Sequence, residues 1–222
     1  MSAIYQLLDF ILHIDSYLFV LIQDYGVWIY AILFLIIFIE TGLVFMPLLP
    51  GDSLLFAAGT FCAGVQVDNE VAQLNLFVVL SLLIAAAIIG DALNFYIGHK
   101  FGRKLAQLKI GRFALLKEKH LQQTQNFFEK HGSKTIIIAR FVPIVRTFAP
   151  FTAGLARMRY PIFLRFNVIG GFTWVLCLTL LGYFFGNLNI VRENFETVIF
   201  GIIGLSLLPM FIAIIKERWP KR

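Results

Sequence analysis

The first 99 residues of this 222-residue chain contain no lysine and no arginine. All 19 lysines and arginines lie between Lys100 and Arg222, whereas the 13 acids divide into eight before Lys100 and five after it. Basic residues concentrate in the cytoplasmic loops of membrane proteins, so this asymmetry favours a membrane protein with a fixed orientation. The low charged fraction (14%), 59% hydrophobic residues, 24 phenylalanines and a mean hydropathy of +0.81 exclude an ordinary soluble domain.

Residues that build disulfides, metal sites or leader sequences are also scarce. The chain has only two cysteines, Cys62 and Cys177, in separate apolar segments, and nothing in the sequence suggests a disulfide framework or a metal site. A basic region before an apolar core is missing at the N-terminus, so we expect no cleavable signal peptide. The sequence gives no reason to expect a cofactor or a nucleic-acid partner.

The loops set the expected orientation. Nine lysines and arginines lie between Lys100 and Lys134, and four more lie in the tail at 216–222, so both regions are predicted to be cytoplasmic. The connections 66–73 and 187–196 carry few cations and should lie outside. The N-terminus carries acids but no cations, and we place it outside too, in the periplasm.

Hydropathy divides the N-terminal half into three parts. Residues 1–22 are amphipathic and predict a helix along the membrane surface. Residues 27–45 are apolar and just long enough to cross the membrane, but the return limb 53–63 is too short for a core of about 30 Å. We therefore predict a re-entrant hairpin at 27–64, followed by a full span at 76–97.

The C-terminal half repeats this order. Residues 117–131 predict an amphipathic surface helix with Gly132 at its C-cap, and the broken segment 134–156 predicts a second re-entrant hairpin. Two spans at 166–186 and 197–215 follow.

The two halves start on opposite sides of the membrane, and such inverted repeats with broken helices are typical of secondary transporters. We expect an all-α polytopic membrane protein with an inverted repeat, two re-entrant hairpins facing each other, about three full spans and amphipathic surface helices. The chain forms a single domain, with a first repeat (1–98), a basic cytoplasmic connection (99–133) and a second repeat (134–216).

Three acids are candidate functional residues because ionisable groups at membrane depth are costly and usually mark a substrate or ion path. Glu40 lies deep in an apolar helix, where a carboxylate needs a partner. Asp52 follows Pro50-Gly51, where it could cap the return helix, bind substrate, or do both. Asp91 could line the same cavity or could simply contact water near the interface.

The cationic candidates lie in the second broken segment. Arg146 lies between Pro143 and Pro150, whose broken backbone should expose carbonyl and amide groups. Arg140 could contribute to the site or reach the interface. An arginine suits phosphate because its planar fork bonds two oxygens at once. Thr147 and Thr152 could add hydroxyl donors or bond to their own helix.

Enzymatic alternatives fit less well. Gly51-Asp52 and Gly90-Asp91 superficially resemble an intramembrane aspartyl protease, but the partner motif with tyrosine before aspartate is missing. A lipid phosphatase would need a catalytic nucleophile or a group of histidines. The sequence has no serine-elbow motif and no metal-binding spacing among its four histidines, His13, His99, His120 and His131. We therefore expect no enzyme.

Several segments of the sequence together form a recognisable signature. They are Glu40-Thr41-Gly42, Pro47-Leu48-Leu49-Pro50-Gly51-Asp52-Ser53, Gly90-Asp91, Phe127-Phe128-Glu129-Lys130-His131-Gly132, Arg140-Phe141-Val142-Pro143-Ile144-Val145-Arg146-Thr147 and Ala153-Gly154. This set resembles the DedA family, whose members carry the VTT (SNARE-associated) domain. The resemblance covers about residues 25–215. It departs from the family at His99, where many members carry arginine after Gly98, so the role of that segment stays open.

The resemblance implies a bacterial inner-membrane protein that moves lipids with the proton motive force, either undecaprenyl phosphate or phosphatidylethanolamine. It also implies that the essential acids are Glu40 and Asp52 and the essential arginines Arg140 and Arg146. We hypothesise that the arginines form ion pairs with Glu40 and Asp52 and exchange these carboxylates for a lipid phosphate. The released carboxylates then take up protons. The expected partners are lipids and protons, and the sequence leaves the oligomeric state open, including a homo-oligomer. The rivals are a proton-coupled exporter of small cationic solutes and a non-transporting membrane scaffold.

Overall fold

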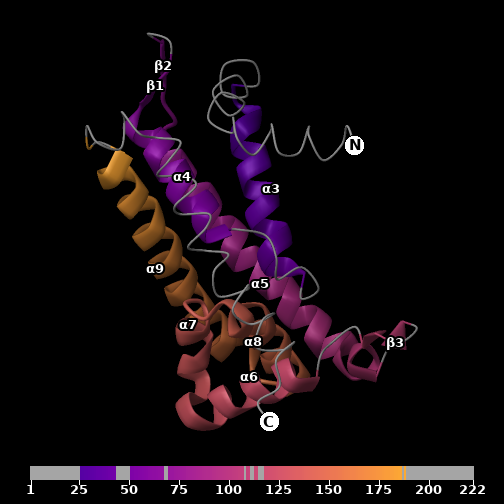
Figure 1. The fold of residues 1–222 in the computed structure, drawn as a ribbon. Coiled ribbons are helices and arrows are strands. Elements are labelled where there is room, and N and C mark those ends of the chain that lie inside the picture. Colours follow the sequence, from indigo (N-terminus) through magenta and orange to yellow (C-terminus); the bar gives the residue numbers. More distant parts are fainter. Residues whose placement is uncertain are drawn as a thin grey trace, which may run out of the picture. The chain divides into compact units, whose positions relative to one another are not determined.

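The computed structural model describes residues 26–43, 51–67, 70–107, 109–110, 113–114, 118–186 and 188. These residues are helical apart from two short antiparallel hairpins (Figure 1). Two described helices are long and apolar enough to cross a membrane, over Leu76–Gly102 and Tyr160–Phe185. The predicted all-α membrane class is confirmed. The predicted surface helix at 1–22 and the predicted span at 197–215 lie outside the described residues.

In chain order the elements are α3 (Trp28–Gly42), α4 (Gly51–Ala63), β1 (Val65–Val67), β2 (Glu70–Ala72), α5 (Leu76–Gln107), β3 (Lys109–Ile110), β4 (Phe113–Ala114), α6 (Glu118–His131), the 3-10 turn η1 (Gly132–Lys134), α7 (Thr135–Ala139), α8 (Pro143–Leu155) and α9 (Tyr160–Gly186). The predicted amphipathic helix at 117–131 is α6. Gly132 follows it with φ of +57°, a left-handed conformation that glycine adopts readily, as predicted for the C-cap.

Two helices extend beyond their predicted bounds. Helix α5 continues ten residues past the predicted end at 97, because the basic residues that follow end the apolar stretch without ending the helix. Helix α9 begins at Tyr160, six residues before the predicted start. Its second residue is Pro161, and a proline in the first turn removes no helical hydrogen bond.

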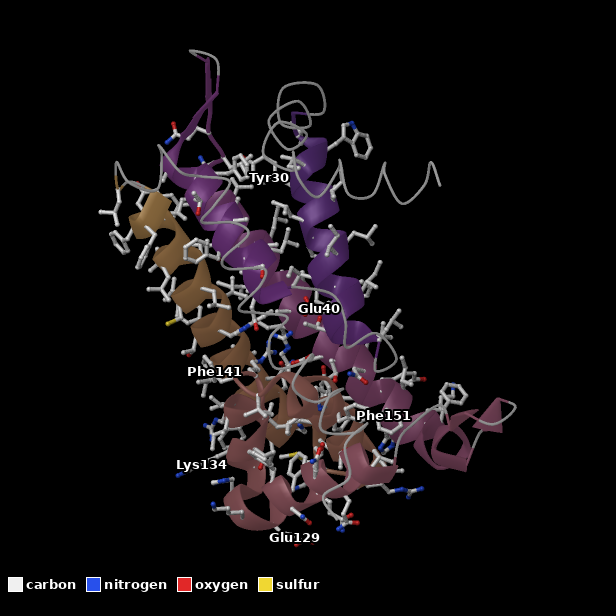
Figure 2. All side chains as sticks on the ribbon, viewed as in Figure 1. Tyr30, Glu40, Glu129, Lys134, Phe141 and Phe151 are labelled. Atoms are coloured by element: carbon white, nitrogen blue, oxygen red, sulfur yellow. The ribbon has the colours of Figure 1, made fainter. Side chains whose placement is uncertain are left out.

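The predicted break in segment 134–156 is found between α7 and α8. Val142, with φ of −118° and ψ of 105°, is extended, because the ring of Pro143 disfavours helical backbone at the preceding residue. Phe141 at this break is exposed (Figure 2). That the segment turns back within the membrane stays a prediction.

The expected second break around Pro150 is wrong. Helix α8 continues through this proline, and the Arg146 amide donates to the Val142 carbonyl at 2.9 Å. Proline cannot donate a helical hydrogen bond, and membrane helices tolerate it when neighbouring groups bond the nearby backbone. Near this proline, Asn94 Nδ2 donates to the Thr147 carbonyl at 2.9 Å.

The chain forms two compact units, and α3, α5 and α9 contribute residues to both. The described residues of the first unit are 26–33, 51–67, 70–80, 177–186 and 188. In it, α4 and the end of α9 touch backbone to backbone. A Cβ atom added to Gly182 would lie 2.0 Å from the Phe56 carbonyl oxygen, and the Thr60 hydroxyl donates to the Gly182 carbonyl at 3.2 Å.

The described residues of the second unit are 34–43, 81–107, 109–110, 113–114 and 118–176. Helices α6, α7 and α8 gather in it (Figure 1), and α8 packs closely on α5. A Cβ atom added to Gly98 of α5 would lie 2.2 Å from the Phe151 carbonyl oxygen of α8. The Phe95 and Phe163 rings stack at 4.4 Å between centroids in the apolar core of this unit. The candidate site lies in this unit.

Candidate functional site

A buried ion pair joins α3 to α8 in the second unit. Arg146 Nη2 donates to Glu40 Oε1 at 2.7 Å. Glu40 is 1% exposed and Arg146 is 9% exposed. Figure 2 labels Glu40 on α3. One of the predicted pairings between an N-terminal acid and a C-terminal arginine is therefore present in the structure.

A second buried ion pair joins α5 to the break before α8. Arg140 Nη2 pairs with Asp91 Oδ2 and also donates to Asn167 Oδ1 at 2.6 Å. Asn167 Nδ2 in turn donates to the Ile88 carbonyl of α5 at 3.0 Å. Both charged residues are buried, so Arg140 does not reach the interface and Asp91 does not simply contact water. Arg140 was expected to pair with Glu40 or Asp52, and its partner Asp91 is a finding of the structure.

A tryptophan links the two pairs. The ring of Trp174 on α9 lies 5.7 Å from Arg140 Cζ and 5.1 Å from Arg146 Cζ, measured to the ring centroid. Its side chain is fully buried. Gly170 and Gly171 lie against the Arg140 side chain, so the face of α9 beside Trp174 leaves room for this arginine.

Asn94 fixes the backbone beside the first pair. Its Nδ2 donates to the Thr41 carbonyl at 3.2 Å and to the Thr147 carbonyl at 2.9 Å. These two residues directly follow Glu40 and Arg146 in the sequence. One buried amide therefore bridges the two helices at the positions where the ion pair forms.

The cluster lies within the length of a long apolar helix and is formally neutral. At about 1.5 Å per residue, Asp91 is about 22 Å from the start and about 16 Å from the end of the Leu76–Gly102 span. Two carboxylates balance two guanidinium groups. Such charges are stable in an apolar interior only when they are paired and hydrogen-bonded. Asn167 supplies such a hydrogen bond to Arg140, and Trp174 adds a cation–π contact to each arginine.

The other predicted site residues, Thr147, Thr152 and Asp52, take part in neither of the two ion pairs described above. Thr147 and Thr152 are buried on α8, and the Thr152 hydroxyl has no hydrogen-bond partner among the described residues. Asp52 is half-buried and is the second residue of α4, which begins one residue earlier than a cap at Asp52 would require. A carboxylate in the first turn still suits the positive end of the helix dipole. It belongs to the first unit, so its role at this site stays a prediction.

Sequence reasoning missed three members of the cluster: Asn94, Asn167 and Trp174. The two asparagines carried a usable signal, because a polar amide inside an apolar span needs a hydrogen-bond partner in the membrane. Trp174 carried none, since tryptophan is common in membrane spans. Among the described residues, no group of three or more histidine, cysteine, aspartate or glutamate side chains could hold a metal ion.

These features define an all-helical membrane protein with a buried cluster of two arginine–carboxylate pairs, and comparison with known proteins places it in a family. The chain belongs to the DedA family, because the family model described as the VTT domain matches residues 49–184. The predicted resemblance is confirmed.

Individual relatives cover most of the chain. It is 51% identical to protein DedA of Escherichia coli strain K12, over 98% of this chain and 96% of that protein. It is 44% identical to an uncharacterized membrane protein of Mycobacterium leprae, over 80% of this chain and 76% of the relative. It is 31% identical to inner membrane protein YqjA of Escherichia coli K12, over 84% and 79% of the two chains. No solved structure matches the chain.

Proposed function

We propose that this protein is a flippase that moves a phosphate-bearing lipid across the bacterial inner membrane, driven by protons. The observation that carries the proposal is the pair of buried arginines, Arg140 and Arg146, each held by a carboxylate. The name of the relative called an inner membrane protein supports the location. The activity requires no covalent chemistry.

Stability alone does not account for these ion pairs. Removing two charges from water costs several kcal/mol per ion, and well-packed apolar residues often stabilise a protein as much or more. Charged groups within the membrane usually serve a substrate or ion path. The desolvation cost of two buried ion pairs therefore supports a functional role for them.

The chemistry follows from exchanging one anion for another. A lipid phosphate offers oxygens that match the arginine fork as well as a carboxylate does. When phosphate binds Arg146, Glu40 loses its partner in an apolar surrounding and takes up a proton, because burial disfavours its charged form. The same exchange applies to Arg140 and Asp91. Protonation keeps the occupied site close to neutral and couples lipid movement to the proton gradient.

The charge distribution of the chain supports an orientation with the N-terminus in the periplasm and the C-terminus in the cytoplasm. An exporter of small cations is less consistent with the site, because the carboxylates of Glu40 and Asp91 already face arginines. In a non-transporting scaffold, the ion pairs would serve only to hold the helices together. Lipid movement separates these alternatives.

The test is reconstitution into liposomes that contain a chemically reportable phosphatidylethanolamine or undecaprenyl phosphate, with an imposed proton gradient. We expect the wild-type protein to move lipid, and Glu40→Gln and Arg146→Ala to stop it. Arg146→Lys should also fail, because lysine keeps the charge but lacks the two-pronged geometry. Arg165→Ala, which removes an exposed arginine of α9, is the matched control and should retain activity. A wild-type protein that moves no lipid would refute the proposal.

A further inference from the structure

One aromatic ring serves both arginines of the site. Trp174 lies 5.7 Å from Arg140 Cζ and 5.1 Å from Arg146 Cζ and is 1% exposed. The face of an indole ring attracts cations, and the attraction is largest where water is excluded. Two like charges beside one ring repel each other, so the ring and the anions of the site must together offset this repulsion.

The strength of the ring's contribution depends on the anion that faces the arginines. With two carboxylates, each guanidinium is matched by one negative charge and attracts the ring weakly. A phosphomonoester carries about −1.5 to −2 at neutral pH and almost matches two arginines. A phosphodiester carries a single negative charge, so once both carboxylates have taken up protons, the two arginines that share it keep one excess positive charge. The ring then faces a cation that its anion does not neutralise.

We propose that Trp174 is a specificity-determining residue that allows the site to accept phosphodiester lipids as well as phosphomonoester lipids. This inference rests on the proposed function and deepens it. Trp174 attracts the uncompensated positive charge that remains when one diester phosphate bridges Arg140 and Arg146. A phosphomonoester such as a polyprenyl phosphate needs little of this attraction, whereas a phosphodiester lipid such as phosphatidylethanolamine needs all of it.

The test replaces Trp174 with mono-, di- and trifluorotryptophan, which weaken the ring's attraction for cations while keeping its shape. Binding of dioctanoyl phosphatidylethanolamine, a diester, and dioctanoyl phosphatidic acid, a monoester, is measured by calorimetry on the purified full-length protein. Across the series we expect diester affinity to fall by about tenfold, as expected for a buried cation–π contact. Monoester affinity should fall by no more than about threefold, because little positive charge stays uncompensated. The same analogues at Trp28, which is 69% exposed, are the matched control and should change neither affinity.

Each outcome decides the inference. Equal losses for both lipids, or no loss for the diester, overturn the role of Trp174 while the proposed function stands. A wild-type protein that binds neither lipid overturns both. Trp174→Leu, measured with its melting temperature, provides a second variant and should reduce diester affinity more than monoester affinity. A fluorinated series with unchanged melting temperatures excludes a folding defect as the cause of any loss.

Discussion

Removing one partner of the Glu40–Arg146 pair should destabilise the protein far more than removing both. The two groups lie 2.7 Å apart, so their attraction is about 6 kcal/mol at an effective dielectric constant of about 20. Desolvation of the two ions consumes most of this attraction, because each buried ion costs several kcal/mol. The intact pair therefore contributes little net stability, but either ion alone retains its desolvation cost.

The perturbation is a double-mutant cycle with Glu40→Leu, Arg146→Met and both together. We expect each single variant to lower the free energy of unfolding by about 3–5 kcal/mol, because it leaves a buried charge without its partner. The double variant should be near wild-type or up to about 4 kcal/mol more stable, since apolar side chains fill the space without desolvating ions. Unfolding is measured in detergent micelles by denaturant titration.

The control cycle combines Glu40→Leu with Arg165→Met, an exposed position on α9. These two effects should add, because distant and unconnected sites are independent. If the effects of Glu40→Leu and Arg146→Met also add, the two residues are not coupled and the reasoning is refuted. A stable double variant that moves no lipid would show that the pair is kept for function and not for folding.

Three further predictions follow from other contacts. Gly98→Ala should destabilise the protein by about 1–3 kcal/mol, because the added Cβ would lie 2.2 Å from the Phe151 carbonyl oxygen and disturb the packing of α5 on α8. Gly42→Ala is the control and should be tolerated, because the nearest atoms to its added Cβ lie 3.5 Å away. Thermal unfolding compares the two, and equal losses would contradict the close approach. Thr152→Val should leave lipid movement unchanged and should keep or slightly raise the free energy of unfolding, because it removes a buried hydroxyl that has no hydrogen-bond partner among the described residues. Loss of lipid movement would instead show that this hydroxyl contacts the substrate. Asp52→Asn should cost less than about 1 kcal/mol of stability, as expected for a carboxylate at a helix start, yet stop lipid movement; full activity in the liposome assay would remove Asp52 from the site.

Much of the fold and part of the site could be predicted from the sequence, because single positions carried the signal. Pro143 predicts the break between α7 and α8, since the residue before a proline avoids helical backbone. Glu40 and Arg146 are conspicuous because a charge in an apolar segment has few structural explanations. The same reasoning failed at Pro150, because α8 continues through this proline, as membrane helices can.

The partners within the site could not be predicted, because they depend on how the helices rotate against one another. The pairing of Asp91 with Arg140 joins α5 to a break 49 residues later. The bridges made by Asn94 and the stacking of Trp174 depend on the same rotations. The charge and hydropathy patterns fix which segments enter the membrane and leave the angles between them undetermined.

Proton uptake on lipid binding tests the central claim most directly. Purified protein in weakly buffered detergent solution, with a pH indicator, is mixed with dioctanoyl phosphatidic acid. We predict that the wild-type protein takes up protons from solution as phosphate displaces the carboxylates, and that Glu40→Gln takes up fewer while still binding the lipid. Lipid binding by the wild-type protein without any proton uptake would contradict the exchange of carboxylate for phosphate at Arg140 and Arg146.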